Sequence, residues 1–256
     1  MVAGTLSDRA CVEDSRSLDR SPAHCMALVA CLHLLALAGP LHQAAEQGDL
    51  EAVSKLIAEG VSLEEKDDDN YTPLHLAAGM GAVDIARELL NHGAKVDSTD
   101  ENGETPLHLA AHVGRLPVAE LLIGRDAPLE AADVAGNRPL HMAAEKGQQA
   151  LAELLLRSGA DAAPAAENGA TPLHWAAHHN QPQVAATLIK HGAPLDIKDV
   201  EGKTPVDLAL EASKGGAGGD VLEVLKKMAR HEHERKRQRQ EPPDRSYQRA
   251  QKRDEL

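Results

Sequence analysis

The sequence predicts an all-α solenoid of stacked helix-turn-helix units, joined by short β-hairpin tips. Two observations lead to this prediction. A short motif recurs every 33 residues through most of the 256-residue chain. Aromatic residues are nearly absent, with no Phe, two Tyr and one Trp, so Leu, Ala, Val and Ile must fill the interior. Ala and Leu suit closely packed helices, because both are strong helix formers and Ala lets helices approach.

The repeated motif is the tetrapeptide Thr-Pro-Leu-His, which occurs in full at three places and in altered form at three more. The six motifs start at Gly39, Thr72, Thr105, Arg138, Thr171 and Thr204. One such unit cannot bury its own apolar face, but a stack of units can. Residues 39–230 are therefore predicted to form a single solenoid rather than two domains.

Each unit is expected to contain two helices. A Thr stands where its side chain can cap the first helix, and Pro follows in the first turn, where its missing N–H costs nothing. Residues that tolerate a positive φ end this helix, at Gly48, Gly81, Gly114, Gly147 and Asn180. A second helix with paired apolar residues follows, and it ends at Gly60, Gly93, Gly159 and Gly192, with Asp126 as the exception.

The segments between units and the sixth unit complete the pattern. Asn-Gly pairs, such as Asn102-Gly103, predict tight hairpins between units. In the sixth unit Asp207 replaces the motif His, and a glycine-rich segment precedes Asp220. Asp220 can cap a further helix, which would close the stack and continue to Gln240, before Pro242-Pro243.

This 33-residue unit with its Thr-Pro-Leu-His-x-Ala-Ala motif resembles the ankyrin repeat over residues 39–230. The resemblance implies a protein-binding module that uses a concave face formed by the hairpin tips and first helices. It also implies that the motif His is structural and bonds to the Thr and to nearby backbone. Read onto this chain, the partner-binding residues are expected to be Asp69, Tyr71, Met80, Glu101, Glu104, His112, Asn137, Lys146, Trp175, His178 and Lys203.

Trp175 is the strongest single candidate, because large aromatic side chains dominate interface energetics and its counterparts in the other units are smaller. A partly buried residue packed between units is the equal alternative. Fourteen histidines invite a metal hypothesis, but the pair His108 and His112 lacks the Glu of a zinc-binding helix. No nucleophile constellation or phosphate loop appears, so we expect no enzyme, no cofactor and no metal.

The two ends of the chain suggest a different compartment from the family's usual cytoplasm or nucleus. Residues 1–38 precede the repeats, and 26–38 form an apolar run that ends in Ala36-Leu37-Ala38. This run can be a cleaved signal peptide or a helix that covers the first repeat. The last residues, Arg253, Asp254, Glu255 and Leu256, resemble a retention signal, which favours the endoplasmic reticulum lumen. Asn70 begins a glycosylation sequon, Asn70-Tyr71-Thr72.

Charge distinguishes the body from the tail. The chain has 40 acidic and 27 basic residues, whereas the tail 231–256 contains a basic cluster at 235–239. An acidic body repels nucleic acid, so only this cluster could support a nuclear or nucleic-acid-associated role, which is the alternative function. The leading prediction is a monomeric adaptor, scaffold or inhibitor that binds one or more proteins, including basic segments. No small-molecule substrate and no membrane span are expected.

Overall fold

The computed structural model describes residues 39–214 and 219–240, with side chains described as far as His231. All of these residues fall within the unit Ala38–Leu256. The predictions for residues 1–38 and for Arg253, Asp254, Glu255 and Leu256 lie outside the described residues. The basic cluster at 235–239 is described only as helical backbone.

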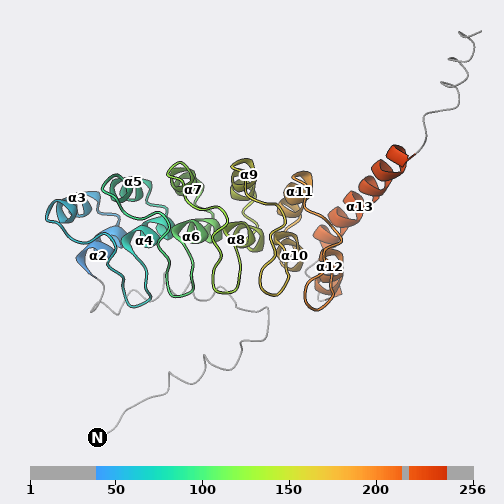
Figure 1. Ribbon diagram of the computed structural model, residues 1–256, viewed down its shortest axis with the longest axis horizontal. Helices are drawn as coiled ribbons and strands as arrows, with labels where there is room; N and C mark the ends of the chain where they lie inside the picture. Colours follow the sequence, from blue (N-terminus) through green and yellow to red (C-terminus); the bar gives the residue numbers. More distant parts are fainter. Residues whose placement is uncertain (1–38, 215–218, 241–256) are drawn as a thin grey trace, which may run out of the picture. The chain divides into compact units, whose positions relative to one another are not determined.

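The described residues form six helix pairs that follow the six predicted motif starts (Figure 1). The inner helices, which begin at the motif, are α2 (Pro40–Gln47), α4 (Pro73–Met80), α6 (Pro106–Val113), α8 (Pro139–Glu145), α10 (Pro172–His178) and α12 (Pro205–Lys214). The outer helices are α3 (Leu50–Ala58), α5 (Val83–Asn91), α7 (Leu116–Ile123), α9 (Gln149–Arg157), α11 (Pro182–Lys190) and α13 (Gly219–Gln240). Each inner helix packs against the next inner helix and against its own outer helix. The predicted all-α solenoid is confirmed.

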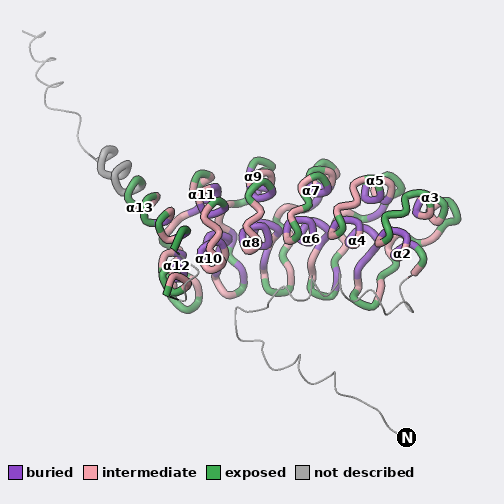
Figure 2. Tube along the Cα trace, turned by 180° about the vertical axis from the view of Figure 1, so that it is seen from behind, coloured by how far each residue is buried: buried purple, intermediate pink, exposed green. Residues whose placement is uncertain are grey.

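Small and aliphatic residues fill the core, as the composition predicts. Figure 2 shows that burial concentrates in the inner row of helices and on the facing sides of the outer row. The motif Leu and the two Ala residues after it are nearly inaccessible in the first five units, as at Leu107, Ala110 and Ala111. Buried aliphatic residues of the outer helices, such as Leu122, fill the layer between the rows. Ala at the inner positions lets the inner helices approach closely enough to exclude water.

The predicted helix ends are confirmed by backbone geometry. The glycines predicted to end helices all have a positive φ, for example 80° at Gly81 and 92° at Gly93. Asn180 and Asp126, the predicted non-glycine substitutes, also adopt the left-handed region, with φ of 52° and 61°. The sequence therefore marks these stops even where glycine is absent.

The hairpins between units are turns closed by two backbone hydrogen bonds, and no strand forms in the described residues. In the hairpin at 100–104, the Asp100 N–H donates to the Glu104 carbonyl at 3.0 Å. The Asp100 carboxylate accepts from the N–H of Asn102 and of Glu104 at 2.9 and 2.7 Å. The expectation of β-hairpin tips is corrected to this extent, because five residues leave room for one bonded pair and no ladder.

Neighbouring hairpins are linked tip to tip. The N–H groups of Val134, Glu167 and Val200 donate to the carbonyl oxygens of Asn102, Ala135 and Asn168 at 2.8, 3.0 and 3.0 Å. At the linked hairpins a glycine permits this approach, since a Cβ on Gly136 would lie 2.7 Å from the Glu167 nitrogen. The first hairpin has Asn70 at this position, and within the described residues no backbone bond of this tip-to-tip kind joins it to the next hairpin.

The motif histidine joins each unit to the next one. In the second unit, the Thr72 N–H lies 3.2 Å and its hydroxyl 2.8 Å from His75 Nδ1. His75 Nε2 lies 3.1 Å from the carbonyl of Glu104, the last residue of the hairpin that leads into the next inner helix. A carbonyl only accepts and an amide N–H only donates, so the imidazole is neutral with its proton on Nε2, and the hydroxyl donates to Nδ1.

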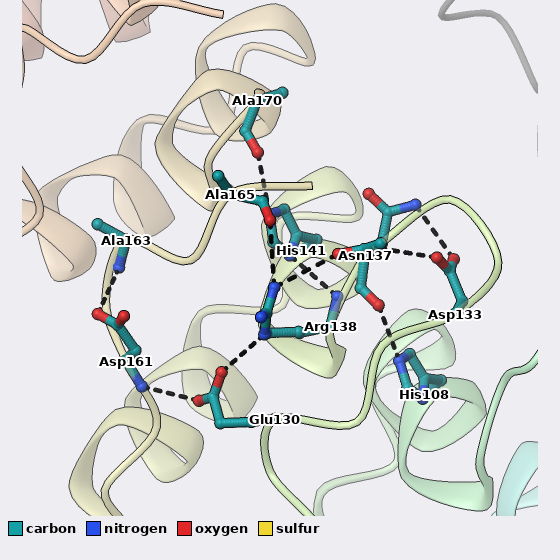
Figure 3. A network of polar contacts seen from close by, with 11 residues as sticks. His108, Glu130, Asp133, Asn137, Arg138, His141, Asp161, Ala163, Ala165 and Ala170 are labelled. Carbon is teal, nitrogen blue, oxygen red and sulfur yellow. Dashed lines mark hydrogen bonds and ion pairs between the residues drawn. The ribbon is translucent and has the colours of Figure 1, made fainter. Parts of the chain in front are cut away.

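The same joint recurs along the stack. Nε2 of His42, His108, His141 and His174 faces the carbonyls of Tyr71, Asn137, Ala170 and Lys203 at 2.9 to 3.2 Å. Burial disfavours the imidazolium and lowers the pKa of His75 and of His141 to about 4. Figure 3 shows this joint around His108 and His141. The expectation that these histidines are structural agrees with this geometry.

Arg138 replaces the motif Thr in the fourth unit and extends the same joint. Its N–H still donates to His141 Nδ1 at 3.0 Å. Its guanidinium lies 2.9 Å from the Glu130 carboxylate and donates to the Ala165 carbonyl at 3.2 Å (Figure 3). The side chain therefore adds a further contact to the histidine joint at this place in the stack.

α13 closes the stack as the predicted helix after the glycine-rich segment. Val221 and Leu225 are buried against α11 and α12. The Asn180 side chain accepts a hydrogen bond from the Val221 N–H at 3.1 Å and so caps the start of α13. Asn180 thus ends the α10 segment through its left-handed backbone and caps α13 through its side chain.

Candidate partner-binding surface

We define the inner face as the solvent-facing side of the inner helices together with the hairpins at 67–71, 100–104, 133–137, 166–170 and 199–203. Corresponding residues of neighbouring units lie side by side there, because each inner helix packs on the next. Of the predicted binding residues, Asp69, Met80 and Glu101 are exposed. Six more are half-buried: Glu104, His112, Lys146, Trp175, His178 and Lys203.

The remaining two predicted residues, Tyr71 and Asn137, are buried, so their side chains offer little surface to a partner. Both are the last residue of a hairpin, whose carbonyl must reach the histidine of the preceding unit. The Tyr71 N–H donates to the Asp67 carboxylate at 2.8 Å, and the Asn137 side chain donates to the Asp133 carboxylate at 3.1 Å. The Asn137 side chain is thus held against its own hairpin, and the Tyr71 ring lies beside the His75 ring, with centroids 5.8 Å apart.

Glu104 occupies the same hairpin position but is half-buried among acidic groups. Burial, and then the charges of Asp100, Asp133 and Glu145, raise the pKa of its carboxyl group to about 7. Asp100 and Asp133 are already bonded within their own hairpins. Within the described residues, no group donates a hydrogen bond to the Glu104 carboxylate. It is therefore an acidic side chain held on the inner face without a cation.

Glu145 and Lys146, at the end of α8, form an ion pair beside Glu104. Lys146 Nζ lies 2.8 Å from the Glu145 carboxylate, and the two side chains are 20% and 11% exposed. His112 lies on the preceding inner helix, and the pKa of its imidazole is lowered by burial and by the Lys146 charge, against an opposing effect of Glu145. These residues come from two neighbouring units, so the stacking of α6 on α8 brings them together.

Trp175, His178 and His179 form an aromatic cluster on α10. The rings of Trp175 and His179 stack with centroids 5.7 Å apart and planes 5° apart. His178 meets His179 edge-on, with centroids 4.9 Å apart. Trp175 also packs against the core, and its indole N–H is buried without a hydrogen-bond partner in the described part of the chain. Trp175 thus combines packing between units with a face toward solvent.

Lys203 has the position of Glu104 in the sixth unit, but it is paired. Its Nζ lies 3.0 Å from the Glu201 carboxylate and 2.8 Å from the Glu211 carboxylate. Hydrogen bonds to Glu211 and then to Glu201 raise the pKa of Lys203 above its usual value. The sequence prediction missed Glu211. The signal for Glu211 was its charge, opposite to that of Lys203, at a spacing of eight residues that places Glu211 at an exposed position of α12.

Exposed apolar side chains accompany these charged groups. Met80 and Val113 stand at the ends of α4 and α6, and Val134 and Val200 stand at hairpin tips, with 49%, 36%, 58% and 72% of their surfaces exposed. The inner face therefore offers both apolar and ionic contacts to a macromolecule. Within the residues that the structure describes, no cluster of His, Cys, Asp or Glu could hold a metal ion. No described helix is long and apolar enough to cross a membrane.

Comparison with protein families decides the identity of the repeats. A family model of ankyrin repeats matches three overlapping segments, residues 41–133, 97–166 and 140–234. The chain belongs to the ankyrin-repeat family. Ankyrin repeats are protein–protein interaction modules, so the inner face is the first surface to consider for partner binding. Comparison with curated proteins finds no match.

Proposed function

We propose that this ankyrin-repeat protein is an adaptor, scaffold or inhibitor that binds partner proteins on its inner face without catalysis. The observation that supports this most is the Glu104 carboxylate, which is held half-buried on a preformed surface and has no neutralising cation among the side chains that the structure describes. Exposed Met80, Val113 and Val134 lie on the same face. A surface with unpaired charge and exposed apolar groups gains free energy when a partner covers it.

The proposed contact residues are the predicted ones that the fold leaves accessible. They are Asp69, Met80, Glu101, Glu104, His112, Lys146, Trp175, His178 and Lys203. The backbone joints and the hairpin links hold these side chains in place before binding, which limits the conformational entropy lost on association. Their acidic excess favours a partner with a basic segment, and we propose that the chain acts as a monomer.

Partner recovery by affinity purification of the full chain tests this function. The Trp175→Ala plus Lys146→Glu variant removes the aromatic anchor and reverses a charge on the inner face. The matched control, Ile189→Ala plus Lys190→Glu, truncates a half-buried apolar residue and reverses a charge on α11. We expect partners to be lost tenfold or more with the first variant and retained with the second. Equal recovery by both variants would contradict binding at the inner face.

The endoplasmic reticulum lumen stays a prediction, and Asn70 supplies a test of it. The sequon hydroxyl of Thr72 is buried and donates to His75, so a glycan at Asn70 requires modification before the second unit folds. Chain expressed in eukaryotic cells is expected to begin at Gly39 and to carry a glycan that Asn70→Gln removes. An unprocessed, unglycosylated chain in the cytosol would contradict this compartment.

A further inference from the structure

The sixth unit shows what kind of group fits between a hairpin and the inner helix that follows it. There the Lys203 ammonium bridges Glu201 on the hairpin and Glu211 on α12, at 3.0 and 2.8 Å. The hairpin end and the inner helix thus hold a cation on the inner face. The cation belongs to the chain itself, so this position of the sixth unit is already filled.

The corresponding positions of the third unit carry Glu104 and His112, each 99 residues before Lys203 and Glu211. Glu104 therefore has the position of Lys203 but the opposite charge, and no side chain in the described part of the chain offers it an ammonium group. The charged groups that act on it are all carboxylates: Asp100 and Asp133 from the hairpins, and Glu145 from α8. Glu145 is satisfied by Lys146, so Glu104 is the group that lacks a counter-charge.

We propose that Glu104 receives a lysine or arginine side chain from a basic segment of a partner protein, which supplies at the third unit the cation that Lys203 supplies at the sixth. This inference rests on the proposed function and specifies the chemistry of the partner. The partner side chain approaches over the inner face, between the hairpin at 100–104 and the end of α8. Exposed Val113 and Met80 lie on the neighbouring helix ends, where they can cover the aliphatic part of a long basic side chain.

Two further observations favour a basic protein segment over other occupants. Burial and then the neighbouring carboxylates raise the pKa of the Glu104 carboxyl group to about 7, and a cation bound there would lower it. The surrounding Asp100, Asp133 and Glu145 carboxylates repel the phosphates of nucleic acid and attract ammonium or guanidinium groups. Geometry and charge therefore favour the same class of partner.

Selection of peptides on the immobilised full chain at pH 8, from a displayed library of random dodecapeptides, tests the proposal. We expect the enriched peptides to share a Lys or Arg at one position. Replacing that residue by Ala, or using the Glu104→Gln chain, is expected to weaken binding about tenfold, and the two changes together should weaken it little further. Glu120→Gln, an exposed carboxylate on the outer helix α7 of the same unit and outside the inner face, is the matched control and should change affinity less than twofold.

A second variant separates loss of the site from loss of the fold. Glu104→Lys plus His112→Glu copies the Lys203 and Glu211 pair into the third unit, so the chain fills the site with its own ammonium. This variant is expected to unfold at the same urea concentration as the wild type or a higher one, and to lose the basic peptides. Retained affinity in a folded double variant would overturn the proposal.

The remaining outcomes distinguish this inference from the proposed function. Peptides that bind without Lys or Arg, and are lost with Trp175→Ala plus Lys146→Glu, would overturn the basic residue at Glu104 and leave the inner face as a binding surface. A wild-type chain that enriches no peptide would also overturn the inference, while partner recovery with the face variant still decides the function. A synthetic peptide of residues 231–245 that binds more tightly than every selected peptide would assign the site to the chain's own tail and overturn a partner.

Discussion

The sixth unit and the interior units hold their inner helices with different residues at the same position. In the interior units, histidine accepts from the motif residue through Nδ1 and donates through Nε2 to the next hairpin. In the sixth unit, the Asp207 carboxylate accepts from the Thr204 N–H and hydroxyl at 2.9 and 2.7 Å. Within the described residues no hairpin follows the sixth helix pair, so Asp207 has no carbonyl acceptor that needs a donor. The comparison separates two roles of the histidine, which are capping its own helix and joining the next unit.

The largest expected effect is acid destabilisation of the interior joints. The pKa of His75 and of His141 is lowered to about 4 in the folded chain, against an ordinary value of 6.5. Their contribution to the free energy of unfolding is therefore complete above pH 6.5 and is lost as the pH falls from 6.5 through 4. With about 1.4 kcal/mol for each unit of pKa change, the histidines together should lose several kcal/mol. Urea unfolding at pH 7.5 and 4.5 measures this loss.

Two groups provide controls for the acid effect. The pKa of Glu104 is raised to about 7, so protonation of this residue stabilises the fold as the pH falls from 7 toward 4.5, and Glu104→Gln removes that opposing contribution. The pKa of Asp207 is lowered by its bonds to Thr204, so its contribution is retained until the pH falls below its ordinary value of 3.8. Stability that rises on acidification in the Glu104→Gln chain would contradict neutral joint histidines.

Exchanging the two capping residues tests the joint directly. His108→Asp places a carboxylate at a fully buried site and leaves the Asn137 carbonyl without its donor, which should cost about 3–5 kcal/mol. The reciprocal Asp207→His keeps a cap and removes no joint, so a change of about 1 kcal/mol or less is expected. Urea unfolding of both variants at pH 7.5 supplies the comparison. Equal costs would show that capping alone explains the histidine.

The hairpin links offer a comparison between matched glycines. Gly136 and Gly202 have φ of 77° and 78°, but a Cβ on Gly136 would meet the next hairpin at 2.7 Å, whereas nothing lies within 4 Å of one on Gly202. Gly136→Ala should therefore cost about 2–3 kcal/mol, against about 1 kcal/mol for Gly202→Ala, which carries only the left-handed strain. Thermal unfolding of the two variants separates strain from the link. A difference near zero would mean that the hairpins are free to move apart.

The smallest expected effect lies at the first hairpin. Asn70 has a φ of 61° where the other hairpins have glycine, and its hairpin lacks the link to the next one. Asn70→Gly relieves the strain and makes room for the Glu101 N–H to donate to the Asp69 carbonyl, for a gain of about 0.5 kcal/mol. Hydrogen exchange should show slower exchange of the Glu101 amide, with Asn70→Ala as the control that leaves exchange fast.

Most of the fold could be predicted from the sequence because the residues that start and end each helix recur with the repeat. Capping Thr residues, prolines and positive-φ residues recur every 33 positions, and even Asp126 could be assigned as a helix end from its place in the period. It was less informative about the inner face. The last hairpin position carries Tyr71, Glu104 and Asn137 in successive units, and only the packing of neighbouring units decides that two of these are buried.

The properties of Glu104 could not be predicted from its own unit. Its pKa depends on carboxylates from two hairpins and from α8, whose closeness follows from the stacking distance. The Lys203 and Glu211 ion pair could have been predicted from the sequence. Their eight-residue spacing runs from the hairpin end through two turns of α12, which brings the two side chains together. The repeat therefore predicts where side chains lie, while contacts between units decide their protonation.

The histidine joint also gives the array a direction. Each interior unit presents a carbonyl acceptor to the unit before it and an imidazole donor to the unit after it. Any two interior units are thus interchangeable at their junctions. Removal of a full 33-residue period, such as 105–137, takes out His108 together with its acceptor Asn137, and leaves His75 with the Glu104 carbonyl and His141 with the Ala170 carbonyl. A deletion within the repeats that is not a multiple of 33 residues moves the histidine Nε2–H out of register with its acceptor carbonyl. The chain can consequently lengthen or shorten by whole units, with Asp207 as the residue that ends the series.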